Sequence, residues 1–320
     1  NPEISIVVPI YQVEQYIENC MISICNQTFE SYEIVLVNDG SKDESLRIAE
    51  NVLLKNGMQY IVLHQDNRGL SAARNKGIKA SNGKWIVCVD SDDVINKNFL
   101  KVLYDGTINK NIDLSIVNFK SVTLDNHFLE SKIYIKTEVV TNDEIMKLFL
   151  YRKYKIIVPA MLFRKKLIEA ENLYFNELIR FSEDQEFIWR ILFKIKLCAY
   201  NESMLYNYLS RDNSIMKASS IENIMTGYNG IKVMLNQLDK YSEKNIFDKI
   251  MCRWVLGSLH SASKMMNYED FKSLAIKMNY QNYVINLFFF NDYRVKILAC
   301  VLSINLKSFY KILKWRPSQG

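Results

Sequence analysis

The stretch Trp85-Ile86-Val87-Cys88-Val89-Asp90-Ser91-Asp92-Asp93 joins an apolar run to three carboxylates. The apolar run predicts a buried strand, and carboxylates crowded at its end repel one another and are costly to desolvate. A hard divalent cation relieves this repulsion by taking carboxylate oxygens as ligands, and a substrate phosphate completes its coordination shell. The stretch therefore predicts a Mg²⁺ or Mn²⁺ site for a phosphorylated ligand. Taken alone, it also fits a solvated acidic turn.

Three earlier apolar runs predict further strands, and each ends in polar or special residues. They are Ile4–Val8, Glu33–Val37 and Tyr60–His64. Segments with helical spacing lie between the strands, and a capping-box pattern at Ser41–Glu44 predicts a helix start; another helix is predicted over Leu70–Ala80. Near-continuous apolar strands separated by amphipathic helices indicate an α/β fold with a mostly parallel sheet and helices on both faces. Ligands of such sheets bind at the carboxyl ends of the strands.

The pattern changes twice along the 320 residues, which suggest about two domains. After residue 112 we expect strands at 114–120 and 132–136, a helix from Thr141 to Leu150, and extended segments at 158–163 and 200–209. After residue 218 the chain is predicted to be helical, over 221–238, 246–266 and 293–314. We therefore predict that residues 1–112 and 113–218 are two halves of one α/β domain. Residues 219–320 are predicted to form a helical domain.

Charge and cysteine content narrow the classes of function. The net charge is +6, but residues 1–215 carry 26 basic and 28 acidic side chains, whereas residues 216–320 carry 15 and 7. This distribution argues against a nucleic-acid groove and favours a basic tail that meets an anionic surface. The six cysteines are scattered, without a C-x-x-C pair, and no apolar run reaches the roughly 20 residues of a membrane span. With no signal peptide before the first strand, these features predict a cytoplasmic protein.

A second carboxylate site is predicted near residue 184. Ser182 and Gln185 fit a capping box, which places Glu183 and Asp184 in the first turn of a helix. Asp184 shares one helical face with the apolar residues Phe187, Ile188 and Ile191. The helix N-terminus favours its ionised form, and an ionised carboxylate in a cleft can take a proton from an acceptor hydroxyl. For Glu183 we expect a helix-dipole or supporting role.

Two other polar residues each allow two interpretations. Asp39 ends the second strand, where its carboxylate either accepts the imide N–H of uracil or serves as a loop residue before a helix. Arg74 lies on the helix after Gly69 and is either a planar donor to a diphosphate or a surface arginine. No G-x-G-x-x-G follows the first strand and no P-loop is present, so the acidic stretch with its metal is the candidate for phosphate binding.

Five segments together resemble glycosyltransferase family 2, of the type that builds bacterial surface glycans and capsules. They are Val7–Tyr11, Val37–Asp43, Asn67–Gly77, Asp90–Asp93 and Glu183–Asp184, and their order and spacing match the family over about residues 3–215. The resemblance implies the GT-A fold, with a nucleotide-sugar half before an acceptor half. It also implies an inverting transferase that uses a UDP-sugar, a hexose or N-acetylhexosamine, and acts on a glycan, glycolipid or glycoprotein.

The resemblance also assigns roles to individual residues. It implies that Asp39 reads the base, that Asp90 lies near the ribose, that Asp92 binds the metal with Asp93 beside it, and that Asp184 is the general base. The remaining predicted donor contacts are Pro9, Tyr11, Asn67, Arg74, Ser91 and Arg211. The family often has Tyr-His-Tyr before a basic loop, whereas this chain has Tyr206-Asn207-Tyr208.

Two functions from other classes remain as alternatives. A sugar-nucleotidyltransferase also combines an α/β sheet with a metal, but it carries a Gly-rich basic loop after the first strand, and Pro9–Ile17 contains no Gly, Lys or Arg. A non-catalytic sugar- or nucleotide-binding module would not need Asp184 and the acidic stretch together.

The C-terminal segment is basic and apolar. After Asp292 the charged residues are all basic, namely Arg294, Lys296, Lys307, Lys311, Lys314 and Arg316. On one continuous helix, Lys296, Ser303, Lys307, Lys311 and Lys314 would form a narrow polar stripe. We expect either an interfacial helix on the anionic inner face of the membrane or a helix buried in the domain or between subunits.

Overall fold

The computed structural model describes residues 1–108, 111–123, 133–134, 136–210, 220–238, 244–288, 290 and 292–315. The chain divides into two compact units. The first comprises residues 1–177 and 187–212, and the second comprises residues 178–186 and 213–320. Residues 1–112 and most of residues 113–218, the two predicted halves, therefore lie in one unit.

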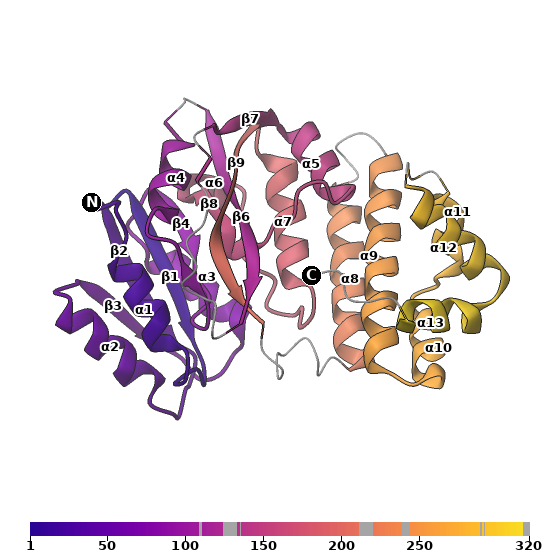
Figure 1. Cartoon of the computed structure of the whole chain (residues 1–320), viewed down its shortest axis with the longest axis horizontal. Coiled ribbons are helices and arrows are strands. Elements are labelled where there is room, and N and C mark those ends of the chain that lie inside the picture. The colour runs from indigo at the N-terminus through magenta and orange to yellow at the C-terminus, as the bar shows by residue number, and fades with distance from the viewer. Residues whose placement is uncertain are drawn as a thin grey trace. The chain divides into compact units, whose positions relative to one another are not determined.

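A mixed sheet forms the centre of the first unit (Figure 1). Among the described residues it has nine strands in the order β3-β2-β1-β4-β8-β6-β9-β5, with β7 paired to β9. The four predicted strands are confirmed and run parallel: β1 (Ile4–Ile10), β2 (Tyr32–Asn38), β3 (Tyr60–His64) and β4 (Trp85–Cys88). β1, β4 and the middle of β2 are buried because helices cover both faces, which is why their sequences are almost continuously apolar, whereas β3 at the edge of the sheet is partly exposed.

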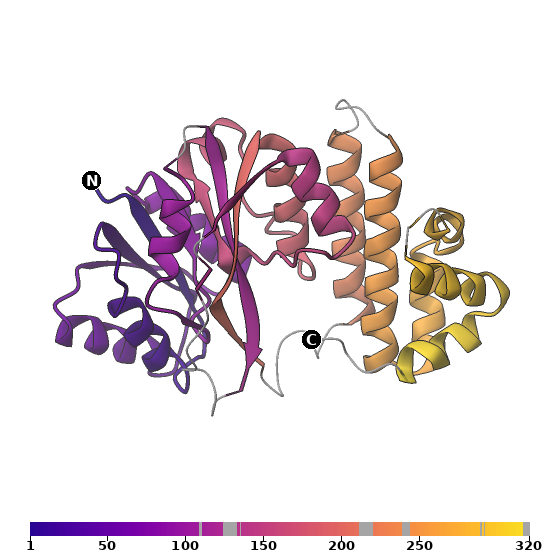
Figure 2. The ribbon, with the colours of Figure 1, turned by 45° about the horizontal axis from the view of Figure 1, so that its top comes forward.

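Side chains of β1 alternate between two cores. Ile6 and Val8 belong to the core formed with α1 (Ile17–Cys25), α2 (Ser45–Lys55) and α4 (Phe99–Asp105). Val7 faces the opposite side, where α3 (Leu70–Ala80) packs so closely that a Cβ on its Gly77 would collide with the Val7 side chain. Figure 2 gives a second view of the sheet with helices packed beside it.

The second half of the unit adds strands of mixed direction. β8 (Met161–Arg164) runs antiparallel to β4 and β6, whereas β6 (Ile112–Val122) and β9 (Leu197–Leu209) are parallel to each other. The short strand β5 (Val94–Ile95) pairs antiparallel with β9. The extended segment expected at 158–163 begins instead with a 3₁₀ turn at Val158–Ala160.

The strand expected at 132–136 is wrong for the described residues 133, 134 and 136, which lie outside any strand. The strand that pairs with β9 is β7 (Glu138–Thr141), a few residues later. The Asn201 side chain explains the shift, because its Nδ2 donates to the carbonyl oxygens of Tyr134 and Lys136 and holds this segment as a loop. Strand propensity alone does not reveal such a side-chain contact.

Helix starts differ in how well local sequence predicted them. The helix expected from Thr141 is confirmed as α5 (Asn142–Leu150), and Thr141 and Glu144 form a capping box. The capping box at Ser41–Glu44 is wrong, because α2 begins at Ser45. The Ser41 hydroxyl instead accepts a hydrogen bond from the Gln12 backbone N–H and donates to Asp43.

The second unit is helical in its described residues, as expected. Its helices are α8 (Ile221–Leu238), α9 (Lys244–Met265), α10 (Tyr268–Lys277), α11 (Gln281–Leu287), α12 (Tyr293–Ile304) and α13 (Leu306–Trp315). α8 and α9 lie side by side, and α10, α11 and α13 contact α9 (Figure 1). No helix in the described part of the chain is both long and apolar enough to cross a bilayer.

The single helix expected over 293–314 is wrong. It is interrupted at Asn305, whose backbone is extended, with φ −155° and ψ 113°. The Asn305 side chain accepts a hydrogen bond from the Ser308 backbone N–H at 3.0 Å, as an N-cap residue does, and so starts α13 in a new direction. The polar stripe predicted for one continuous helix is therefore divided between two helices.

Glu33 in β2 provides a stability test. Its carboxylate accepts hydrogen bonds from the Ser5 hydroxyl and from the backbone N–H groups of Asn82 and Gly83. We expect Glu33→Gln to lower the free energy of unfolding by about 1–2 kcal/mol at neutral pH, because an amide accepts fewer of these bonds. Urea unfolding measures the change, and Glu30→Gln, at an exposed position, is the control.

The same substitution predicts a pH dependence. Burial acts to raise the pKa of Glu33, but the hydrogen bonds outweigh it and the pKa is lowered. A carboxyl group whose pKa is lowered by folding stabilises the fold at pH values above its ordinary, unfolded-state pKa. This contribution is lost as pH falls through the folded-state pKa. The stability gap between wild type and Glu33→Gln should therefore narrow as pH is lowered below about 5. A gap that widens on acidification would contradict this account.

Candidate active site

The carboxyl ends of β1 to β4 meet at one edge of the sheet. In the parallel register Ile10 lies beside Asn38, and Asn38 lies beside His64. The polar segments that follow these strands are therefore neighbours, as their positions in the sequence predicted. At this edge Tyr11 and Asn67 are exposed, and Pro9 and Ser91 are buried.

Asp39 is a buried organiser of the loop between β3 and α3. Its Oδ1 accepts hydrogen bonds from Gln65 Nε2 at 2.7 Å and from the Arg68 backbone N–H at 2.8 Å, and its Oδ2 accepts from the Gly69 N–H at 2.9 Å. Oδ1 thus accepts two hydrogen bonds and Oδ2 accepts one, so a contact of this carboxylate with a base would use the second lone pair of Oδ2. The contacts make Asp39 part of the framework of the site, and its reading of the base stays a prediction.

Gly40 allows the next loop to approach Asp39. Its φ is +74°, in the region where side chains are strained, and a Cβ there would lie 2.9 Å from the backbone nitrogen of Asn67. The loops after β2 and β3 can therefore touch only because residue 40 is glycine. The sequence analysis assigned Gly40 no role beyond its place in the Asn-Asp-Gly-Ser segment.

Arg74 is not a surface arginine. It is fully buried, and its Nη2 lies 2.8 Å from Asp90 Oδ1, with the guanidinium carbon 5.2 Å from the centre of the Phe175 ring. Arg74 thus orients Asp90 in the first instance, and its contact with a diphosphate stays a prediction. The neighbouring Asn75, to which sequence assigned no role, both donates to and accepts from the backbone of Phe175.

Asp93 is the most enclosed carboxylate of the acidic stretch, with 1% of its surface exposed. Its Oδ2 accepts from the Tyr206 hydroxyl at 2.6 Å, and its Oδ1 accepts from the Leu209 backbone N–H at 2.8 Å. Burial and the charge of Asp90 raise the pKa of Asp93 to about 8. These contacts join the acidic loop to β9. They favour an anchoring role, and direct metal ligation by Asp93 stays a prediction.

Tyr206 is bound to the acidic stretch, although the sequence analysis named it without assigning it a role. Besides donating to Asp93, its hydroxyl accepts a hydrogen bond from the Asp90 backbone N–H at 3.3 Å. Burial, followed by the charges of Asp93 and Asp90, raises its pKa well above the usual value, so the hydroxyl remains protonated. The only signal in the sequence was its place in the Tyr206-Asn207-Tyr208 segment.

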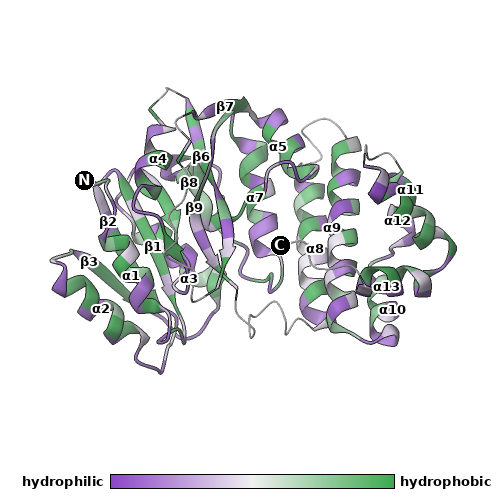
Figure 3. Cartoon of the chain, in the orientation of Figure 1, coloured by the Kyte–Doolittle hydropathy of each residue, from purple (hydrophilic) through white to green (hydrophobic). Residues whose placement is uncertain are grey.

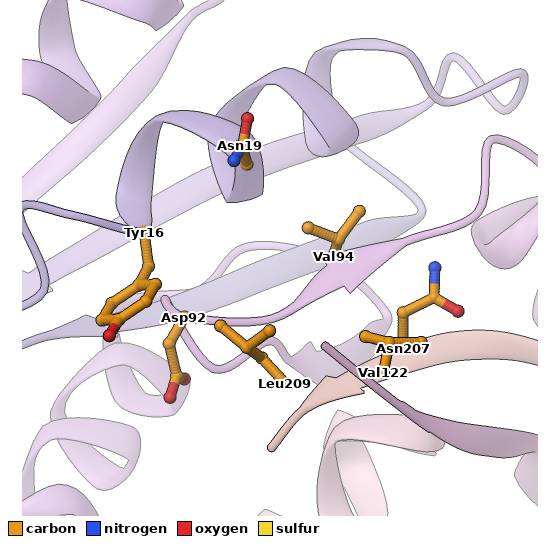
Figure 4. Close-up of a pocket in the computed structure, with 7 residues that line it drawn as sticks. All are labelled: Tyr16, Asn19, Asp92, Val94, Val122, Asn207 and Leu209. Carbon is orange, nitrogen blue, oxygen red and sulfur yellow. The ribbon is translucent and has the colours of Figure 1, made fainter. Parts of the chain in front are cut away.

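Asp92 faces a pocket rather than the protein interior (Figure 4). The Asp92 carboxylate and the ring of Tyr16 lie beside each other and point the same way in Figure 4. The pocket is lined by Tyr16, Asn19, Asp92, Val94, Val122, Asn207 and Leu209. Of the three carboxylates in the acidic stretch, Asp92 is therefore the one that a ligand in this pocket would meet.

The carboxylate oxygens of the acidic stretch are suited to a magnesium or manganese ion that also binds a substrate. No group of three His, Cys, Asp or Glu side chains gathers as a metal cage in the described part of the chain. Asp92 at the pocket and the partly exposed Asp90 are the carboxylates that would supply oxygen ligands. Mg²⁺ is commonly held by one or two carboxylates together with substrate phosphates, so these two residues match that mode of binding.

Three other predicted residues stay untested. Glu183 and Asp184 open α7 (Glu183–Lys194), but residues 178–186 belong to the second unit. Ser182 has a φ of +62°, so it lacks the extended backbone of the capping residue expected there. Arg211 lies outside the described residues, as does most of the basic loop after Tyr208.

A family model described as Glycosyl transferase family 2 matches residues 5–170, which is more than half of the chain. The chain belongs to glycosyltransferase family 2. The family resemblance of the sequence is thereby confirmed, and the match includes Asp39, Arg74 and the whole acidic stretch.

A curated relative and two solved structures are similar to this chain. The uncharacterised glycosyltransferase EpsJ of Bacillus subtilis (strain 168) is 34% identical over 217 residues, covering 67% of this chain and 63% of EpsJ. S. aureus TarS 1–349 in complex with UDP-GlcNAc has a TM-score of 0.67 and 22% identity over 98% of this chain and 90% of that chain. Mannosyltransferase PcManGT from Pyrobaculum calidifontis, in complex with GDP-Man and Mn²⁺, has a TM-score of 0.59 and 13% identity over 98% and 88%.

These likenesses confirm the fold prediction. The chain has the GT-A fold of the family, a mixed α/β sheet with helices, followed by a C-terminal helical region. The match to EpsJ leaves more than a third of that relative uncovered. The acidic stretch of this chain lies where the parallel strands end, with Arg74 bound to Asp90 and Tyr206 bound to Asp93.

Proposed function

We propose that this chain is an inverting glycosyltransferase that moves a hexose or N-acetylhexosamine from a UDP-sugar to a hydroxyl of a glycan, glycolipid or glycoprotein. The observation that carries the proposal is the fixed acidic loop, in which Asp90 and Asp93 are held by Arg74 and Tyr206 while Asp92 faces a pocket. Membership of family 2 and the UDP-GlcNAc complex of TarS support the choice of donor.

The proposed metal site is centred on Asp92, with Asp93 and Asp90 of the same acidic stretch beside it. A Mn²⁺ or Mg²⁺ ion held there would neutralise the charge of the leaving diphosphate. The contribution of the chain is to keep the carboxylates in place before the donor arrives. Arg74 fixes Asp90 by an ion pair, and Tyr206 and Leu209 fix Asp93 through hydrogen bonds. Preorganised groups of this kind cost little reorganisation when the charge develops.

The proposed base is Asp184. Its carboxylate would take the proton of the acceptor hydroxyl as that oxygen attacks the anomeric carbon from the face opposite the diphosphate. The bond between the anomeric carbon and the diphosphate oxygen breaks in the same displacement, so the configuration inverts and no covalent sugar–enzyme intermediate is needed. Glu183, one position earlier in the turn, is proposed to support this helix end through its charge.

The preference for a uracil nucleotide is best tested by changing the nucleotide rather than by replacing Asp39. Because Asp39 holds two backbone N–H groups and Gln65, its replacement would disturb the loop as well as any contact with the base. If Asp39 accepts the imide proton of uracil, UDP should bind better than CDP, which lacks that N–H, by roughly 1–3 kcal/mol. Calorimetry with each nucleotide and Mn²⁺ measures this difference.

A screen of sugar nucleotides tests the whole proposal. The chain is incubated with each donor and Mn²⁺, and release of free nucleotide diphosphate is recorded with and without simple acceptors. Release of UDP from one UDP-sugar is expected, and it separates the transferase from a non-catalytic binding module. Release of pyrophosphate from UTP and a sugar phosphate would instead identify a sugar-nucleotidyltransferase.

Tyr206 should control donor binding through the acidic loop. Tyr206→Phe keeps the ring that packs against Phe99 but removes the hydroxyl shared by Asp90 and Asp93. We expect the dissociation constant of UDP with Mn²⁺ to rise about tenfold, because the buried carboxylate of Asp93 loses one of its two hydrogen-bond donors. Tyr200→Phe, a buried tyrosine earlier in the same strand, is the matched control. Equal UDP affinities in both variants would argue against this coupling.

A further inference from the structure

The outer side of α12 carries an apolar row that points away from the core. Tyr293, Ile297, Cys300 and Ile304 follow one another at spacings of four, three and four residues, so they share one side of the helix. Ile297 is 55% exposed and Ile304 is 83% exposed. The opposite side of the same helix buries Val295, Leu298, Ala299 and Leu302. The domain core therefore does not explain the outer row.

The next helix, α13, also carries exposed apolar side chains. Phe309, Tyr310 and Leu313 are buried, whereas Ile312 is 39% exposed and Trp315 is 92% exposed. The other three tryptophans of the chain, Trp85, Trp189 and Trp254, are each 4% exposed. Together, Tyr293, Ile297, Cys300, Ile304, Ile312 and Trp315 form what we call the α12–α13 outer face.

Basic side chains surround this face, and acidic ones are missing from its helices. From residue 293 to residue 315 the sequence holds no Asp or Glu, while Arg294, Lys296, Lys307, Lys311 and Lys314 are all exposed. Asp292, just before α12, forms an ion pair with Arg294. Figure 3 shows hydrophobic residues on both α12 and α13.

We propose that the α12–α13 outer face docks on the surface of an anionic bilayer. Helices that lie in the membrane interface combine an apolar side, including Trp, with flanking Lys and Arg that meet acidic headgroups. A second copy of the chain is the poorer occupant. A two-fold contact would set this acid-free face against itself and bring like charges together, and lysine is depleted from protein interfaces.

Vesicle co-sedimentation of the full chain tests the proposal. The vesicles are phosphatidylcholine alone or phosphatidylcholine with one third phosphatidylglycerol. We expect binding to the anionic vesicles only, and its loss at about 0.5 M salt because salt screens the attraction. Lys296→Gln/Lys311→Gln should weaken binding at least tenfold, since each basic residue near the surface contributes about fivefold.

A second pair of variants separates apolar insertion from charge. Ile297→Ser/Ile304→Ser removes two exposed apolar side chains and should also weaken vesicle binding about tenfold or more. The matched control is Leu54→Ser/Lys55→Gln, an exposed apolar–basic pair on α2, which should bind as wild type does. All variants should retain the far-UV circular dichroism of the wild type, because the replaced side chains lie in solvent.

Trp315 reports directly on the contact. Since the other tryptophans are buried, quenching of tryptophan emission by brominated phospholipids should come from Trp315 and vanish in Trp315→Phe, which should still sediment with the vesicles. The proposal is overturned if the wild type ignores anionic vesicles at low salt, or if the lysine and isoleucine pairs bind them as tightly as the control. A dimer that Ile297→Ser/Ile304→Ser splits, without vesicle binding, would assign the face to a second copy.

Discussion

Asp184→Asn should reduce the rate of sugar transfer by about 10²- to 10⁴-fold, the usual effect of removing a general base. The substitution keeps the size of the side chain but removes the charge that attracts the acceptor proton. Binding of UDP with Mn²⁺ should change little, because the proposed donor contacts lie in the acidic stretch and at the strand ends. Single-turnover transfer and calorimetry measure these two quantities separately.

Glu183→Gln is the matched comparison for Asp184→Asn. It removes one carboxylate from the same first turn of α7. Both substitutions therefore weaken the favourable interaction of acidic side chains with the helix dipole to a similar extent. If Asp184 is the base, its replacement must cost at least about ten times more than that of Glu183. Transfer by Asp184→Asn near the wild-type rate would rule out the assignment, whatever the result for Glu183.

Removal of divalent metal should abolish transfer, and Mn²⁺ or Mg²⁺ should restore it. The expected physical cause is loss of the charge that compensates the diphosphate as it leaves. Asp92→Asn should therefore weaken UDP binding strongly in the presence of Mn²⁺, by about 10- to 100-fold, and hardly at all in a chelator. Calorimetric titration under both conditions gives the two dissociation constants.

The control for Asp92→Asn is Asp105→Asn on α4, where an exposed carboxylate pairs with Lys101. It should leave the metal dependence of UDP binding unchanged. Identical UDP affinities for the wild type with and without metal would contradict the proposed role of Asp92, even if the enzyme proved to be a transferase. Metal-independent transfer would leave the fold and family intact but require another source of charge compensation.

Local sequence predicted the parallel half of the fold well. The runs at Ile4–Val8 and Trp85–Val89 are apolar because both faces of their strands are covered, and this pattern does not depend on distant residues. The helix expected at Leu70–Ala80 has the same bounds in the structure. Because the strands are parallel, their carboxyl ends must share an edge, so the gathering of Asp39 and Asp90 there also followed from sequence.

Contacts between distant residues decided what pattern alone could not. Tyr206 lies 113 positions after Asp93, yet its hydroxyl holds that carboxylate. Arg74 looked like a surface residue because helical spacing does not show that Asp90 and Phe175 enclose it. The start of α2 moved to Ser45 because the Ser41 hydroxyl is engaged by Gln12, from the loop after β1. In each case the partner becomes a neighbour only after the chain has folded.

Sequence by itself thus determined three features of the parallel strands. Their interiors are apolar, their carboxyl ends are polar, and three carboxylates follow β4. Tertiary structure alone decided how each carboxylate is held. Asp93 accepts hydrogen bonds, Asp90 forms an ion pair with Arg74, and Asp92 lines the pocket. The reason is that a buried carboxylate is tolerated only where donors or a cation compensate it, and β9 and α3 supply those partners from other parts of the chain.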